Sequence, residues 1–189
     1  MVQALRADAP QGPAYLLGLS LGAMAAIEWA CRHPQEVAGC VLLSTSLRPF
    51  SRFYERLRPR AYASLARILL DGDALAREGR ILRLTSTREP EGALLSDWAR
   101  FTRECPVSRA NALRQLVAAA RYRAPEAPPP VPVLLLAGRQ DRLVDWRCSA
   151  ALARRWRAPI SIHPSAGHDL ALDDGAWVAA RVREWLRPT

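Results

Sequence analysis

Lysine is absent from this 189-residue sequence, in which all 27 basic residues are arginine. Such an absence is typical of a codon bias towards GC-rich DNA, so the number of arginines says little about binding partners. The formal net charge of +9 is therefore poor evidence for nucleic-acid binding. We predict no nucleic-acid partner.

Long hydrophobic runs are missing as well. The sequence has no stretch of 18 apolar residues, so we expect no membrane-spanning helix. The N-terminus carries Arg6 and Asp8, whereas a secretory leader would be basic and then apolar. These two observations favour a cytoplasmic protein without a membrane partner.

The few cysteines lack the spacing of a metal or redox site. They form no C-x-x-C pair and no metal-ligand pattern, so we predict no metal centre. We expect them to be buried free thiols in a reducing compartment. The four are Cys31, Cys40, Cys105 and Cys148.

What is present is the composition of one globular domain, with 50% hydrophobic and 24% charged residues. Its centre is the pentapeptide Gly18-Leu19-Ser20-Leu21-Gly22. The apolar run 14–17 before it predicts a buried strand, and the alanine-rich segment up to His33 predicts a helix that Pro34 ends.

A serine between strand and helix, with glycine two residues away on each side, is the G-x-S-x-G arrangement. It exposes the Ser20 hydroxyl at the N-terminus of a helix, where backbone N–H groups favour developing negative charge. We expect a side chain at Gly18 or Gly22 to collide with the neighbouring strand and helix. The alternative is a glycine-rich turn in which Ser20 only caps the helix.

Three further apolar runs predict strands at 37–45, 131–137 and 160–163, and the βαβ pattern implies a mostly parallel sheet. Helices are expected from Cys148 to Trp156 and from an N-cap at Asp174 to Leu186. The fold class is therefore α/β, with about four strands and flanking helices.

Residues 48–123 contain no credible strand and end in a proline-rich linker, 124–130. Residues 86–89, Ser-Thr-Arg-Glu, form a plausible capping box, and Ser108 is a plausible N-cap. The helices expected in this segment are 51–57, 60–70, 73–84, 90–104 and 108–122.

The charge is concentrated in the same segment. Residues 48–123 hold 16 arginines against 8 acidic residues, whereas the rest of the chain holds 11 against 10. We predict that part of this surplus surrounds the mouth of a pocket and favours anionic acyl groups or an acidic carrier. The alternative is a solvated, arginine-rich surface.

Two polar residues follow the last two predicted strands. Asp141 comes just after one strand and His168 just after the next, so both should face the same crevice as Ser20. An imidazole can take the proton of a serine hydroxyl, and a carboxylate can fix the tautomer of that imidazole. The order Ser, Asp, His therefore predicts a catalytic triad.

Three other residues compete for these roles. His33 precedes Pro34 and is expected to cap the end of a helix on the surface. His163 lies within the last strand and is expected to be structural. Asp145 is the rival of Asp141, but it is better placed to cap the helix that contains Cys148.

The segments A-Y-L-L-G-L-S-L-G-A-M, V-L-L-L-A-G-R-Q-D-R-L-V and A-G-H-D-L resemble the α/β-hydrolase superfamily over residues 14–47 and 131–187. The resemblance implies a core of residues 1–47 and 124–189 and a helical cap of residues 48–123. It also implies a nucleophile Ser20, an acid Asp141, a base His168 and an oxyanion-hole donor at the Leu21 N–H. No cofactor or metal is implied, and the substrate would be a small ester or acyl compound.

In general shape the sequence looks like small capped carboxylesterases, such as the pimeloyl-acyl-carrier-protein methyl ester esterases. The superfamily places several strands and a second oxyanion donor before the elbow, but only 17 residues precede Gly18 and no H-G motif occurs. We therefore expect an N-terminally incomplete or degenerate copy, with Tyr15, Leu16 and Leu17 on an open edge and weak turnover from the 189 residues alone.

The leading hypothesis is a serine hydrolase that cleaves carboxylic esters through an acyl-enzyme. A catalytically silent protein that only binds or packs against a partner is the alternative from another class. Acyltransferases and carbon–carbon bond hydrolases use the same triad, so both stay open.

Overall fold

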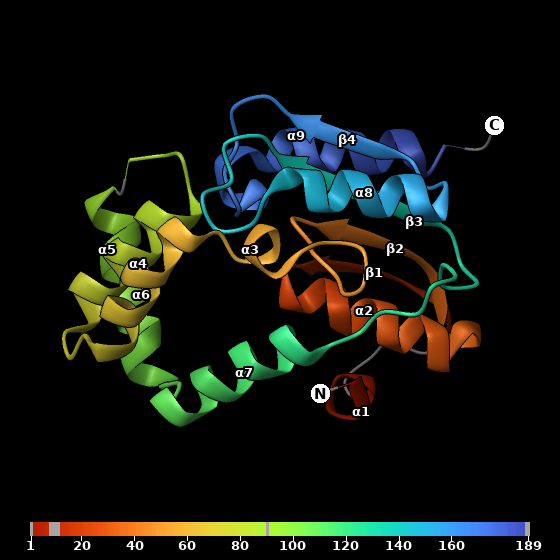
Figure 1. The fold of residues 1–189 in the computed structure, drawn as a ribbon. Coiled ribbons are helices and arrows are strands. Elements are labelled where there is room, and N and C mark those ends of the chain that lie inside the picture. The colour runs from red at the N-terminus through yellow and green to blue at the C-terminus, as the bar shows by residue number, and fades with distance from the viewer. Residues whose placement is uncertain (1, 8–11, 90, 188–189) are drawn as a thin grey trace.

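The computed structural model describes residues 2–7, 12–89 and 91–187. Its centre is a parallel sheet of four strands in the order β1-β2-β3-β4 (Figure 1). The strands are β1 (Ala14–Leu19), β2 (Val37–Leu43), β3 (Val133–Gly138) and β4 (Ile160–His163). The α/β class and the predicted parallel sheet are thus confirmed.

Helices cover both faces of this sheet. Helices α2 (Leu21–Arg32) and α8 (Trp146–Trp156) pack on one face, and α9 (Leu170–Trp185) packs on the other. Two short helices, α1 (Val2–Ala7) and the 3₁₀ turn η1 (Pro34–Glu36), adjoin α2. The buried strands β2 and β3 are apolar throughout because both of their faces are covered.

The register of the strands brings their carboxyl ends together. Leu19 of β1 lies opposite Leu43 of β2, and Leu43 lies opposite Leu136 of β3. Gly138, the last residue of β3, lies opposite His163, the last residue of β4. The loops that leave these four ends therefore meet along one edge, which is where ligands bind in open parallel sheets.

A purely helical segment lies beside this edge. Arg48 and Arg123 form a parallel bridge where the segment leaves and rejoins the sheet layers, and the Ala124 N–H donates to the Arg48 carbonyl at 2.9 Å. Figure 1 shows α4, α5 and α6 packed together, while α7 runs back towards α2. The helices are α3 (Phe53–Arg56), α4 (Pro59–Leu70), α5 (Ala74–Thr85), α6 (Gly92–Glu104) and α7 (Arg109–Arg121).

All five helices predicted for this segment are present, but the predicted capping box is wrong. Ser86 ends α5 instead of starting α6, and its hydroxyl donates to the carboxylate of Asp173, 87 residues later. The Ser86 side chain, which the local sequence pattern assigned to the N-cap of the next helix, instead forms a tertiary hydrogen bond. The N-cap prediction for Ser108 is confirmed, because its hydroxyl accepts from the Asn111 N–H.

The last helix begins one turn earlier than predicted. Asp169 caps α9 by accepting from the Leu172 N–H, and the backbone leaves helical geometry at Asp174 (φ −152°, ψ 77°). Asp174 then accepts from the Trp177 N–H and caps the second part of the helix. The predicted N-cap therefore exists, but it marks a kink inside α9 and not its start.

The prediction of four buried thiols is wrong for two of them. Cys105 is exposed and Cys31 is half-buried, whereas Cys40 and Cys148 are buried. Burial raises the pKa of the Cys40 thiol to about 12 and that of Cys148 to about 11. The two buried thiols thus stay protonated and unreactive at neutral pH.

Strand β1 is the outermost strand of the described sheet. Tyr15 and Leu17 are 55% and 57% exposed, while the intervening Leu16 packs against the core. The predicted apolar edge is thus present at Tyr15 and Leu17 but not at Leu16, and the prediction that residues 14–17 form a buried strand is wrong, because this strand lies at the edge of the described sheet. Within the described ranges, none of the helices has the length and apolar character needed to span a bilayer.

Candidate active site

Ser20 occupies a strained turn between β1 and α2. Its backbone has a positive φ of 52° with ψ −109°, and its N–H donates to the Leu43 carbonyl at 2.9 Å. A positive φ in a non-glycine residue costs energy and persists where the surrounding structure enforces it. The Ser20 hydroxyl makes no capping hydrogen bond to α2, so the alternative of a simple helix-capping serine is wrong.

The two glycines beside this turn differ in their surroundings. A Cβ on Gly18 would lie 2.6 Å from the Ala23 nitrogen and from the Gly22 carbonyl carbon, so a side chain there would collide with α2. A Cβ on Gly22 would meet nothing within 4 Å. The predicted collision is confirmed at Gly18 and wrong at Gly22.

Asp141 and His168 meet above the ends of β3 and β4. His168 Nδ1 lies 2.7 Å from Asp141 Oδ2, and the two residues are only 4% and 3% exposed. The other carboxylate oxygen, Oδ1, accepts the N–H groups of Leu143 and Val144, both at 2.8 Å. The carboxylate is therefore held by two backbone N–H groups and by His168, and His168 Nε2 forms no hydrogen bond with any residue that the structure describes.

The loop that carries His168 is anchored across the sheet at Ser44. The buried Ser44 hydroxyl donates to the His168 carbonyl at 2.8 Å, and Ser44 itself has a positive φ of 47°. Ser44 directly follows β2, the strand that pairs with β1, so the anchor holds the His168 backbone one strand from the Ser20 turn. Sequence reasoning missed Ser44. The only signal was a hydroxyl residue directly after a buried apolar run.

Close backbone packing supports the same loop. A Cβ on Gly138 would lie 2.2 Å from the Gly167 carbonyl oxygen and 2.3 Å from that of Ala166. Glycine at the end of β3 thus lets the backbone of the His168 loop pass directly against the strand.

The rival residues have the structural roles predicted for them. His33 is the C-cap of α2, with its N–H bonded to the Trp29 carbonyl at 2.8 Å. Asp145 caps α8 by accepting from the Arg147 N–H at 2.9 Å. His163 accepts the Ala166 N–H at 2.8 Å through Nδ1 and so shapes the turn that leads to His168.

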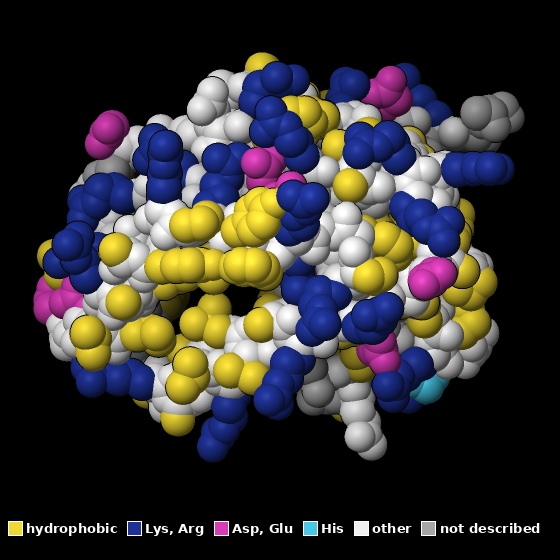
Figure 2. Space-filling view, in the orientation of Figure 1, with side chains coloured by type: hydrophobic (Ala, Val, Ile, Leu, Met, Phe, Trp, Pro, Cys, Tyr) yellow, Lys and Arg dark blue, Asp and Glu magenta, His cyan; other side chains and the backbone are white. Residues whose placement is uncertain are grey.

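Ser20 opens into a cavity of about 310 Å³ beneath the helical segment. Side chains of α3, α4 and α7, such as Phe53, Leu65 and Leu116, make most of its wall apolar. Figure 2 shows the molecule hollowed between α4 and α7, with hydrophobic side chains around the hollow. The volume is at the lower end of the range for small-molecule sites.

One cation lies in the wall of this apolar cavity. Arg56 donates from Nη2 to the Ala119 carbonyl at 2.7 Å, which ties α3 to the end of α7. Burial, together with the nearby charge of Arg48, lowers the pKa of the Arg56 guanidinium. Arg56 nevertheless remains a cation at neutral pH, because an arginine is effectively always protonated in proteins.

Asp173, at the start of α9, joins the His168 loop to the end of α5. Its carboxylate accepts from the Gly167 N–H at 2.6 Å, from the Thr87 N–H at 3.1 Å and from the Ser86 hydroxyl. Burial alone would raise the pKa of Asp173, but the hydrogen bonds from Ser86, Gly167 and Thr87 outweigh it and lower the pKa. Sequence reasoning did not predict this contact.

We expect Asp173→Asn to lower the free energy of unfolding at pH 7 by about 1–2 kcal/mol, a modest value because the carboxylate is only half-buried. The lowered pKa means that the charged carboxylate stabilises the folded state above its ordinary pKa of 3.8 and loses this effect as pH falls through the folded value. Urea unfolding of wild type and variant between pH 7 and pH 3 should show the difference shrinking in acid. Asp97→Asn, at an exposed site on α6, is the matched control, and an equal loss there would contradict the prediction.

The structure thus brings together Asp141 and His168 but records no hydrogen bond between Ser20 and His168, both of which lie in its described part. Catalytic hydrogen bonds are often long or misaligned in unliganded proteins. Leu21 is the first residue of α2, so its N–H has no carbonyl partner within the helix.

A family model described as serine aminopeptidase S33 matches residues 1–175. The chain belongs to this family, within the α/β-hydrolase superfamily. The match covers β1 to β4, the helical segment and all of the candidate site residues. The superfamily resemblance inferred from the sequence is therefore confirmed. A search of the curated proteins found no match.

Solved structures share the fold. A candidate lipase of Acinetobacter baumannii superposes with a TM-score of 0.75 at 21% identity, covering 98% of this chain and 65% of that one. A thermophilic esterase of Thermogutta terrifontis superposes with a TM-score of 0.68 at 21% identity, and the superposition covers 98% of this chain and 67% of the esterase. A 2-hydroxy-6-oxo-6-phenylhexa-2,4-dienoate hydrolase of Rhodococcus superposes with a TM-score of 0.70 at 18% identity, and the superposition covers 93% of this chain and 64% of the hydrolase. The chain thus spans about two thirds of the length of these proteins.

Proposed function

We propose that this protein is a serine hydrolase of carboxylic esters, with Ser20, His168 and Asp141 as its catalytic triad. The observation that carries the proposal is the buried hydrogen bond from His168 to Asp141 on the edge of the sheet where Ser20 makes its strained turn. The two backbone N–H groups bind only Oδ1 of Asp141, so Oδ2 is directed at His168, and this pairing would prepare the imidazole to act as a base.

The reaction would proceed in two steps. Ser20 Oγ attacks the ester carbonyl carbon while its proton passes to His168 Nε2, and the Leu21 N–H stabilises the oxyanion. The carbon–oxygen bond to the alcohol then breaks, and His168 returns the proton to the departing alcohol. In the second step His168 takes a proton from a water whose oxygen attacks the acyl carbon. The bond from that carbon to Ser20 Oγ then breaks, the acid leaves, and His168 returns the proton to Oγ. Asp141 stabilises the imidazolium throughout.

The cavity limits the substrate to a small acyl group. Its volume of about 310 Å³ and its mainly aliphatic and aromatic wall suit a short apolar chain. The chemistry requires no cofactor, because the nucleophile, base and oxyanion donor all come from the protein.

A fluorophosphonate probe tests the assignment of the nucleophile. We expect the probe to label the protein once, at Ser20, because only a serine activated by a neighbouring base reacts at neutral pH. Peptide mass spectrometry locates the label. Ser20→Ala should abolish labelling, whereas Ser96→Ala, an exposed serine on α6, should leave it unchanged. Labelling that persists in Ser20→Ala would contradict the proposal.

A further inference from the structure

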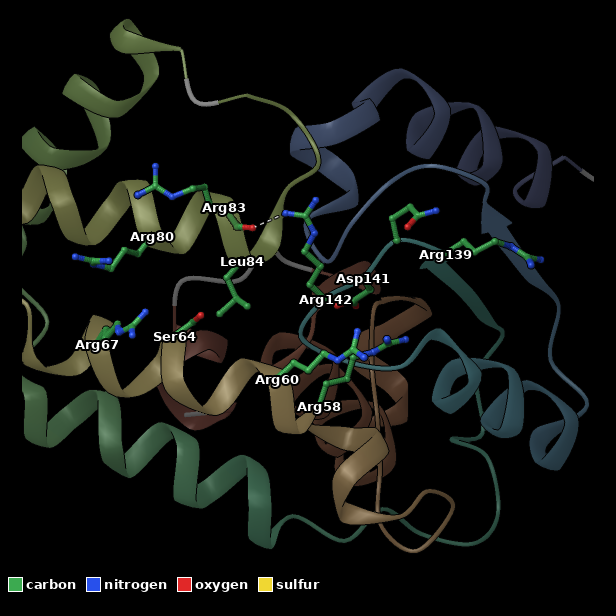
Figure 3. Close-up of a pocket in the computed structure, with 11 residues that line it drawn as sticks. Arg58, Arg60, Ser64, Arg67, Arg80, Arg83, Leu84, Arg139, Asp141 and Arg142 are labelled. Carbon is green, nitrogen blue, oxygen red and sulfur yellow. Dashed lines mark hydrogen bonds between the residues drawn. The ribbon is translucent and has the colours of Figure 1, made fainter.

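A second cavity, of about 560 Å³, lies between the helical segment and the loop that follows β3. Seven of its eleven lining residues are arginines, and we call it the arginine pocket. Figure 3 shows these arginines on α4, on α5 and on the loop that holds Asp141. This pocket is distinct from the apolar cavity that contains Ser20.

Helical spacing places these arginines on one face of each of two helices. Arg60, Ser64 and Arg67 recur every three to four residues on α4 and so share one face. Arg80 and Arg83 are three residues apart on α5 and line the opposite wall. The concentration of positive charge is therefore built by the secondary structure and is more than an effect of composition.

The loop after β3 closes the pocket. Arg142 Nη1 donates to the Arg83 carbonyl at 2.9 Å, which joins this loop to α5 (Figure 3). The guanidinium of Arg139 extends away over the ring of Trp146, 5.0 Å from its centroid. The loop thus contributes one guanidinium that faces α5 and one at the outer rim.

The positive charge of the pocket is only partly balanced. Arg58 pairs with Asp145 at 3.2 Å, and Arg80 pairs with Asp71 at 2.7 Å. Asp141 also lines the pocket, but its carboxylate is bound to His168 and to the loop backbone. Only two of the seven arginines are thus ion-paired within the described part of the chain, and Asp145 is shared with Arg147 outside the pocket, so the pocket keeps an excess of positive charge.

Three arginines of this pocket are exposed and have no acidic partner in the described ranges, and a fourth has a buried donor without an acceptor there. Arg60, Arg67 and Arg83 form no ion pair with any residue that the structure describes. The buried Nε–H of Arg58 has no hydrogen-bond acceptor among the described residues. A buried guanidinium donor without an acceptor is costly, so an oxygen-rich anion that supplies acceptors would be stabilised here.

We propose that the arginine pocket binds a phosphate or diphosphate group carried by the substrate. This inference rests on the proposed ester hydrolase function. A single carboxylate would leave most of the excess charge unbalanced, whereas a phosphate group carries up to two charges and several acceptor oxygens. Planar guanidinium groups match these oxygens with paired hydrogen bonds.

The arginine pocket and the Ser20 cavity share a wall, in which the Arg58 N–H donates to the Leu143 carbonyl at 2.9 Å, and the proposed substrate would extend over this wall. Leu57 lines the Ser20 cavity and Arg58, the next residue, lines the arginine pocket. On the loop after β3, Leu143 lines the Ser20 cavity and the preceding residue, Arg142, lines the arginine pocket. Consecutive Cα atoms are about 3.8 Å apart, so the two sites are separated by little more than one backbone segment.

Calorimetric titration with inorganic pyrophosphate tests the pocket without any need for catalysis. We expect the wild-type protein to bind pyrophosphate, and Arg67→Gln combined with Arg83→Gln to weaken binding by about tenfold or more. Raising the salt from 0.05 to 0.5 M should weaken wild-type binding as well. Circular dichroism melting verifies that each variant is folded.

The matched control is Arg103→Gln combined with Arg114→Gln. These exposed arginines lie on α6 and α7, outside the pocket, and their removal changes the net charge by the same amount. Binding should be unchanged in this control. Equal weakening in both double variants, or no binding to the wild-type protein at millimolar pyrophosphate, would overturn the proposal.

A second measurement asks whether the phosphate belongs to the substrate. We compare kcat/KM for an acetyl ester of a phosphorylated alcohol with that for its uncharged analogue. The Arg67→Gln, Arg83→Gln variant should lose about tenfold for the phosphorylated ester only. Equal rates for the two esters in every protein, with pyrophosphate still bound, would overturn the assignment to the substrate. Pyrophosphate binding without ester hydrolysis or Ser20 labelling would instead overturn the hydrolase function.

Discussion

Ser20→Ala and His168→Ala are each expected to lower kcat for ester hydrolysis by about 10⁴-fold or more, and the double variant is expected to be no worse than either single variant. The reason is that the hydroxyl and the imidazole act in the same proton transfer. Once Ser20 is absent, the base has no proton to remove. The measurement is the hydrolysis of short-chain nitrophenyl esters by all three variants under saturating substrate.

The non-additivity separates a shared catalytic step from two independent structural effects. Ser20 is half-buried and His168 is nearly fully buried, so a loss of folding would appear in the melting temperature. Multiplicative losses in the double variant, or normal turnover in Ser20→Ala, would contradict the triad. Ser96→Ala provides the background rate for removal of a hydroxyl elsewhere.

Asp141→Asn is the second change for which we expect a large loss, again about 10⁴-fold in kcat. Two backbone N–H groups, from Leu143 and Val144, point at Oδ1. They would hold the carbonyl oxygen of the new amide in that position. Its NH₂ group would then face His168 Nδ1 and force the imidazole proton onto Nε2. In that tautomer Nε2 can no longer accept the proton of Ser20.

The tautomer itself provides a readout that a purely structural defect would not change. Nitrogen chemical shifts of the His168 ring should show the proton on Nδ1 in the wild type and on Nε2 in Asp141→Asn. Asp97→Asn, which removes an exposed carboxylate on α6, should leave the rate and the His168 shifts unchanged. A wild-type rate in Asp141→Asn would mean that Asp141 only shapes its loop.

Several features of the fold could be predicted from the sequence because short-range physics decides them. The apolar runs of β2 and β3 predict buried strands and are largely buried, whereas β1 and β4 at the two edges of the described sheet are only partly buried. The helices of residues 53–121 follow from their spacing and their N-caps, such as Ser108. The need for glycine at position 18 could also be predicted, because the sharp turn after it places the backbone of α2 2.6 Å from where a Cβ of residue 18 would lie.

Other features depended on partners that are distant in the sequence. Ser86 and Asp173 are 87 residues apart, so the local capping-box pattern gave no sign of their hydrogen bond. The Ser44 hydroxyl reaches the His168 carbonyl across 124 residues. Helix α9 begins after Asp169 and not after the predicted Asp174. Both residues are good N-caps, and in the structure Asp169 caps the start of the helix while Asp174 caps the part after the kink.

The sequence by itself determined the parallel sheet, the strand–turn–helix around Ser20 and the identity of Asp141 and His168 as partners, because each depends on residue types within a few positions. Only the tertiary structure decided that Asp141 and His168 touch, that Ser44 and Asp173 hold their loop, and that arginines of α4 and α5 line one pocket. These contacts are set by the register of the strands and the packing of the helices, and neither is encoded in any single segment.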